Sequence, residues 1–119
     1  MPPLPEPGAP SAESVVRARF AARAREEVLA LVDEALVAEH AANPFGRHSD
    51  ALDRVLVQLR ARAIAGKEVI LQDAGGGYRL GRLGARRGDA PTPIDGPSYA
   101  TVPEAEHAVF LLRLEELSR

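Results

Sequence analysis

The dipeptide Asn43-Pro44 limits what the first third of this chain can fold into. The sequence from Ser11 to Ala42 holds no helix-breaking residue, so it predicts one long helix that ends at the proline. The proline ring crowds the preceding residue out of the helical region and has no N–H to donate. Phe45 follows directly, which places a large apolar ring on the turn, where it can cover a surface of this chain or of another.

The two halves of this predicted helix differ in chemistry. Ser11 is a suitable N-cap, and the first half is rich in alanine and arginine. The second half repeats apolar residues at helical spacing, from Val28 to Leu36. We therefore expect the second half to pack against the domain, and the first half to project onto a partner or into solvent.

A second helix is predicted after the turn. Ser49 and Asp50 supply its cap, and an apolar stripe from Leu52 to Ala63 carries it to about Ala65. Gly66 is suited to the position just beyond a helix, where the backbone turns left-handed. The two predicted helices form a helical hairpin over residues 11–66.

From Lys67 the pattern changes to strands. Residues 68–73 and 78–83 flank the glycine-rich segment 74–77 and predict a β-hairpin. Residues 84–97 form a Gly/Pro-rich loop, and Ser98-Tyr99-Ala100 is the predicted third strand. Thr101 and Glu104 then form a capping box for a last helix that runs to about Leu117.

The sequence thus predicts an α+β fold: a long helix and a second helix as a helical hairpin, then a small three-stranded antiparallel sheet and a C-terminal helix. Residues 1–10 are Pro-rich and predict a disordered tail. Residues 11–119 form one small domain, in which 67–119 have the order β-β-β-α. The last helix is apolar over more than half its circumference, so we expect it to contact the helical hairpin or another subunit as well as the sheet.

Composition excludes several classes of function. There is no cysteine and aromatic residues are only 4%, so disulfides and thiolate metal sites are excluded and the core must be built from small aliphatic residues. Such side chains bury little area at roughly 25 cal/mol per Å², which predicts a marginal monomer. No signal peptide or membrane span is recognisable. We expect a cytoplasmic protein without membrane contact.

The histidines are the candidates for metal or proton chemistry. Glu104 and His107 have the spacing of a carboxylate-bridged metal helix, and Glu39 precedes His40. Such sites need several of these pairs converging in a bundle core, and this chain has one good pair. We therefore expect helix-surface or capping histidines rather than metal ligands.

The arginines suggest a competing function. Arg79, Arg82, Arg86 and Arg87 lie on the predicted hairpin and its loop, where they could form a nucleic-acid-binding surface over residues 79–87. Interleaved aromatics are nearly absent, acidic residues dilute the patch, and the net charge is -2, so nucleic acid is the less favoured partner. A helical homodimer is the third alternative.

Two stretches of the sequence resemble the small (alpha) subunit of N,N-dimethylformamidase. They are residues 39–46 followed by His48, and residues 104–111 with Arg113 and Glu115 beyond them. Between them, Arg54-Val55, Gly66-Lys67 and Tyr78-Arg79 occur in the matching order. The resemblance extends from about Leu29 to Leu117.

This resemblance implies an accessory subunit of an amidohydrolase. The family hydrolyses N,N-dimethylformamide to formate and dimethylamine, and this chain would serve that amide or a similar one. A mononuclear iron is expected on a separate large catalytic subunit, and no catalytic, cofactor-binding or metal residue is expected on this chain. The resemblance makes the following residues candidates for the partner interface or for structural positions: Glu39, His40, Asn43, Pro44, Phe45, Gly46, His48, His107, Val109, Phe110 and Arg113.

Overall fold

The computed structural model describes residues 11–61 and 66–119. Within these ranges the chain forms α1 (Ala12–Leu31), α2 (Glu34–Ala42), α3 (Asp50–Arg60), β1 (Glu68–Gln72), β2 (Tyr78–Arg82), β3 (Thr92–Pro93) and α4 (Val102–Ser118). The predicted α+β fold class with its antiparallel sheet is confirmed. The predicted tail, residues 1–10, lies outside the described ranges.

The predicted continuous first helix is wrong, because the chain leaves the helix at Val32 and Asp33. Val32 takes an extended backbone with ψ 116°. Asp33 caps α2 by accepting a hydrogen bond from the backbone N–H of Leu36 at 2.8 Å. An aspartate satisfies a free N–H in this way at a helix start. The break lets α1 pack on α3 while α2 contacts both α3 and α4.

The predicted caps of the other helices are confirmed. The hydroxyl of Ser49 accepts a hydrogen bond from the N–H of Leu52 at 3.2 Å, and that of Thr101 accepts one from Glu104 at 3.3 Å. The Glu104 carboxylate bonds the N–H of Ala100, one residue before the expected donor. Helix α3 ends at Arg60, and residues 62–65 of its predicted continuation lie outside the described ranges. The hairpin packing of the helices around the turn stays a prediction.

The third strand lies elsewhere than predicted. Strand β2 pairs antiparallel with β1 on one edge and with Thr92–Pro93 on the other. In place of the predicted strand at 98–100, Tyr99 makes only an isolated bridge to Tyr78. The backbone N–H of Ile94 donates to the carbonyl of Leu80 at 2.9 Å. Ile94 also packs against the apolar cluster under the sheet, which explains why this part of the loop is drawn onto β2.

Strand β2 lies close to both of its neighbours at Gly81. A Cβ at this position would lie 2.6 Å from Cδ1 of Leu71 and 3.1 Å from the carbonyl oxygen of Thr92. We expect Gly81→Ala to lower the free energy of unfolding by about 1–3 kcal/mol through overpacking, measured by urea denaturation. Gly75→Ala is the matched control, because nothing lies within 4 Å of a Cβ there. Equal losses in the two variants would contradict the close approach.

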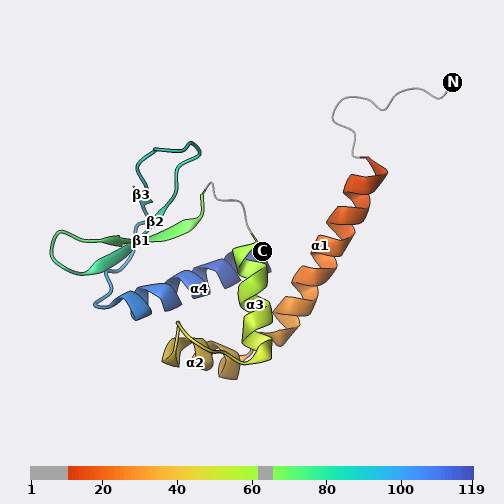
Figure 1. Cartoon of the computed structure of the whole chain (residues 1–119), viewed down its shortest axis with the longest axis horizontal. Helices are drawn as coiled ribbons and strands as arrows, with labels where there is room; N and C mark the ends of the chain where they lie inside the picture. The colour runs from red at the N-terminus through yellow and green to blue at the C-terminus, as the bar shows by residue number, and fades with distance from the viewer. Residues whose placement is uncertain (1–10, 62–65) are drawn as a thin grey trace.

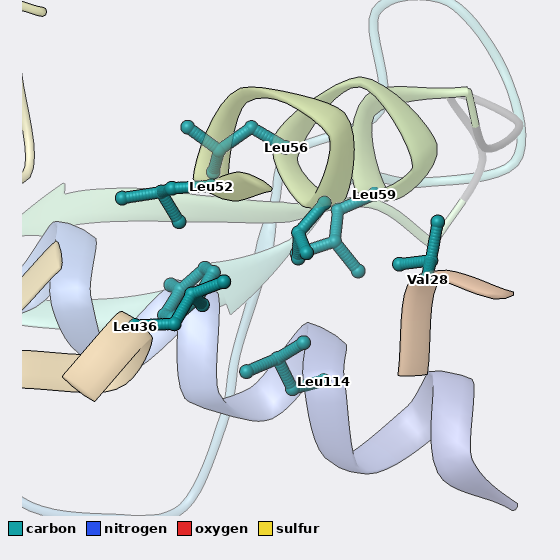
Figure 2. Packing of buried hydrophobic residues seen from close by; sticks show 8 residues of the cluster. Val28, Leu36, Leu52, Leu56, Leu59 and Leu114 are labelled. Carbon is teal, nitrogen blue, oxygen red and sulfur yellow. The ribbon is translucent and has the colours of Figure 1, made fainter. Parts of the chain in front are cut away.

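Helix α4 lies between the sheet and the other helices (Figure 1), and the core is formed on both of its sides. Ala105 and Val109 pack against Leu80 of β2. On the other side, leucines from different helices point into one space (Figure 2). That cluster consists of Val28, Leu36, Leu52, Val55, Leu56, Leu59, Phe110 and Leu114. The expected second contact of α4 is therefore with the helices of this same chain.

Helix α1 leaves this body. Figure 1 shows its N-terminal part extending away from the other elements, while Val28 near its C-terminal end is buried in the core. Residues 11–23 are all exposed. The anchored and projecting parts expected from the sequence are thus both present. In the ranges that the structure describes, no helix combines the length and apolarity needed to cross a membrane.

Candidate functional site

The three histidines of the chain gather where α2, the turn after it and α4 meet. His40 of α2 is only 1% exposed, and its Nδ1 lies 2.9 Å from Nδ1 of His107 on α4. The ring of Phe110 stacks on His40 with centroids 3.9 Å apart and planes 14° apart. The ring of His48 stacks on the cluster from the turn, 6.1 Å from that of His40. The predicted surface or capping position is therefore wrong for His40, which is a core residue.

The electrostatics of this cluster follow from its burial. Loss of water, with His107 close by, lowers the pKa of His40 to about 4. Burial also lowers the pKa of His107. The hydrogen bond between the two Nδ1 atoms requires one to carry a proton and the other a lone pair. Neutral rings near pH 7 meet that requirement, and the bond ties α2 to α4.

The turn after α2 is held by its own side chains. The carboxylate of Glu39 accepts hydrogen bonds from the hydroxyl of Ser49 at 2.6 Å and from its N–H at 2.7 Å, which lower the pKa of Glu39. Nε2 of His48 donates to the carbonyl of Asn43 at 2.7 Å. Gly46 has φ +101°, a left-handed value that a side chain rarely adopts. The turn after α2 is thus fixed, and it carries Phe45, 50% exposed, on its surface.

A second polar cluster centres on Glu68 of β1. Its side chain is 0% exposed and accepts from Arg82 Nη1 at 3.1 Å and from Arg113 Nε at 3.1 Å. Arg82 also donates to Glu116 at 2.7 Å, and this hydrogen bond raises the pKa of Arg82. The cluster joins both long strands to α4. The carboxylates and guanidinium groups of this cluster pair with one another, which fits a role in stabilising the fold.

The candidate residues are divided between these two clusters, the turn after α2 and the sheet-facing side of α4. The structure brings residues 39–48 against α4 through His40, His107 and Phe110, although the two segments are far apart in the sequence. Val109 faces the sheet and Arg113 reaches Glu68. Pro44 lines a small cavity beside His40. Their role at a partner interface stays a prediction.

Sequence analysis missed Glu68. A signal was available, because strand alternation places Glu68 and Ile70 on the same face, and Ile70 packs toward α4. An acidic residue on an inward face requires a cation, and Arg113 on the facing helix provides it. The predicted strand therefore shows that Glu68 shares a face with Ile70, and the structure shows that this face is the buried one.

The arginines considered for nucleic-acid binding and the Glu104/His107 pair considered for a metal ion make other contacts in the structure. Arg82 lies in the Glu68 cluster, and Arg79 approaches Asp73 at 4.0 Å. The carboxylate of Glu104 accepts a hydrogen bond from the N–H of Ala100 in the cap of α4. Across residues 11–61 and 66–119, no group of three or more His, Cys, Asp or Glu side chains is arranged to hold a metal ion.

Comparison with known proteins identifies the family. The family described as N,N-dimethylformamidase alpha subunit matches residues 15–119. The chain belongs to the N,N-dimethylformamidase alpha subunit family. The alpha subunit from an Alcaligenes species is 37% identical over 101 residues, which cover 80% of this chain and 75% of that protein. The alpha subunit from Paracoccus aminophilus is 35% identical over 104 residues, covering 82% and 72%.

The family name describes a subunit of an enzyme complex. An alpha subunit of an N,N-dimethylformamidase is by its name one part of a complex, and the enzyme named is a hydrolase. The match includes both stretches that meet at the histidine cluster and the strand that carries Glu68. The features described above therefore lie in the part of the chain that the family shares.

Proposed function

We propose that this chain is the non-catalytic small subunit of an amidohydrolase that acts on N,N-dimethylformamide or a similar small amide. The observation that supports this proposal most directly is the family match over residues 15–119. In the proposed complex, a separate large subunit carries the mononuclear iron and the residues that hydrolyse the amide to an acid and an amine. The complex resides in the cytoplasm.

The geometry of this chain fits an accessory role. The Nδ1 atoms of His40 and His107 are directed at each other, and Glu68 is held by Arg82 and Arg113. These groups stabilise the small subunit, because each contact joins elements that are distant in the sequence. The surface that remains, with Phe45 on the turn and the extended α1, is suited to contact with a partner.

Co-expression tests the proposal. The chain is tagged and expressed with the large-subunit reading frame of the same genome, and the purified material is assayed for iron and for dimethylamine released from N,N-dimethylformamide. We expect a complex of fixed stoichiometry that contains iron and is active, and no hydrolysis by the tagged chain alone. A chain that purifies alone beside a fully active large subunit would refute the accessory role.

Phe45 is the residue of the turn after α2 that we expect at the interface. Phe45→Ala should weaken association with the large subunit by about 1 kcal/mol or more, as loss of a buried aromatic anchor does. Isothermal titration calorimetry measures the change. Because Phe45 is 50% exposed in the free chain, the melting temperature of the free chain should change little. An unchanged affinity would remove Phe45 from the interface.

A further inference from the structure

The outer part of α1, residues 12–25, is called the arm below. Its residues are exposed except for Ala24, which is half-buried, and Figure 1 shows it extending away from the body. In proteins, most of the stability of a helix comes from packing an apolar face, and isolated helices of this length are marginal in water. The arm therefore requires a surface to pack on in the assembled protein.

An apolar stripe on the arm continues the buried face of α1. Val16, Phe20, Ala24 and Val28 are spaced four residues apart, which places them along one side of the helix. Val28 is 8% exposed, whereas Phe20 is 67% exposed and Val16 is 49% exposed. The face that enters the core at its inner end is thus open at its outer end.

The open stripe leads into a groove between α1 and α3. The groove has a volume of about 350 Å³ and is lined on the α1 side by Ala24, Val28 and Leu31. Val57 of α3 lines the other side and is itself 65% exposed. The apolar stripe thus continues into a groove that polar side chains also line, namely Glu27, Asp53, Arg54 and Gln58, on a side of the molecule away from the sheet (Figure 1).

The arm carries an excess of positive charge. The arm contains Arg17, Arg19, Arg23 and Arg25, with Glu13 as its acidic residue. Arg17 pairs with Glu13, and Arg23 with Glu27 just beyond the arm. Arg19 and Arg25 make no ion pair with any residue that the structure describes. Unpaired cations on the arm, of which Arg19 lies beside Phe20, are complementary to an acidic surface on a partner.

A second copy of the arm carries the same excess of positive charge, so it does not provide that complement. An antiparallel pair of arms centred on Phe20 sets Arg17 opposite Arg23 of the second copy. It also sets Glu13 opposite Glu27 of that copy, so both contacts bring like charges together. The charge pattern therefore favours a different chain with an acidic surface.

We propose that the arm is an element through which this chain docks on its large partner subunit, with Phe20 inserted in an apolar pocket and Arg19 and Arg25 against acidic side chains of that subunit. This inference rests on the proposed function and adds to it the surface that makes the contact. The arm packs on the large subunit and becomes ordered there. The arm then holds the rest of the small subunit near the large one.

The test compares the affinity of full-length variants for the purified large subunit of the same genome. Phe20→Ala is expected to weaken binding about tenfold or more, as truncation of an aromatic anchor does. Arg19→Glu combined with Arg25→Glu is expected to weaken binding and to remove much of its dependence on salt. Because these residues are exposed, the melting temperature of each free variant should equal that of the wild type.

The controls make changes of the same kind outside the arm. Val102→Ala removes an exposed apolar side chain on α4, and Arg86→Glu with Arg87→Glu reverses two exposed charges in the loop. If the wild type binds the large subunit and the arm variants bind it with the same affinity, the inference is overturned and the proposed function stands. Failure of the wild-type chain to bind the large subunit refutes the proposed function itself, and the docking of the arm with it.

Two other outcomes assign the arm to a different occupant and also overturn the inference. One is a homodimer of the free chain, seen by sedimentation equilibrium, that Phe20→Ala dissociates. The other is binding to a 20-base-pair DNA duplex that is lost when Arg19 and Arg25 are reversed while binding to the large subunit is retained. Support requires weaker binding to the large subunit in both arm variants and unchanged binding in both controls.

Discussion

Glu68→Ala is expected to lower the free energy of unfolding by about 3–5 kcal/mol, the range seen when one partner of a buried ion pair is removed. The side chain of Glu68 is 0% exposed and lies 3.1 Å from both Arg82 and Arg113. Arg82 retains Glu116 in the variant, whereas Arg113, 13% exposed, loses the carboxylate that offsets its burial. Urea denaturation at pH 7 measures the loss.

An exposed ion pair at the C-terminal end of α4 provides the comparison for this prediction. Glu115 and Arg119 are 2.7 Å apart, but their side chains are 60% and 72% exposed. Glu115→Ala should therefore change the free energy of unfolding by no more than about 0.5 kcal/mol. Glu68→Gln keeps the volume and one acceptor, so its loss should lie between the two. A loss for Glu68→Ala as small as that for Glu115→Ala would show that water reaches the cluster.

Local rules were sufficient for the elements that depend on neighbouring residues. The caps at Ser49 and Thr101 use side chains that bond a backbone N–H three residues ahead, so the pattern is visible in a short window of sequence. The buried stripe of α3 follows from helical periodicity for the same reason. The fold class followed once the helical and strand segments were placed.

The errors arose where a local signal competed with a longer pattern. Asp33 is a strong N-cap, but the apolar periodicity runs through it, and only the packing of α2 against α4 decides that the helix breaks there. Ile94 lies in the segment 84–97, whose glycines and prolines predict a loop. It is the large aliphatic residue of that segment, and its contacts with the sheet cluster bring Thr92–Pro93 onto β2.

The candidate site depended on contacts that no window of sequence contains. His40 and His107 are 67 residues apart, and nothing in either neighbourhood specifies that their rings meet. The resemblance selected both stretches without giving their geometry. The structure adds that His40, Val109 and Phe110 are buried inside this chain, so their roles in packing are explained without a partner, whereas Phe45 remains available to one.

The histidine cluster predicts that the free chain loses stability as the pH falls. Burial lowers the pKa of His40 from 6.5 to about 4, so between these values the unfolded chain binds a proton that the folded chain does not. The contribution of neutral His40 is therefore fully present above pH 6.5 and is lost as the pH falls toward 4. This difference between the pKa values of the unfolded and folded chains corresponds to about 3 kcal/mol in the free energy of unfolding. His107, whose pKa is also lowered by burial, acts in the same direction.

Carboxylates also titrate in acid, so the test must isolate His40. We compare wild type with His40→Leu by urea denaturation at pH 7 and at pH 4, because the carboxylate contributions are common to both chains and cancel in the difference. The variant is expected to be less stable at pH 7, since His107 loses its hydrogen-bond partner. The stability advantage of the wild type should shrink by about 3 kcal/mol at pH 4. A constant advantage, together with an imidazole NMR titration of His40 near 6.5, would contradict the burial of a neutral ring between α2 and α4.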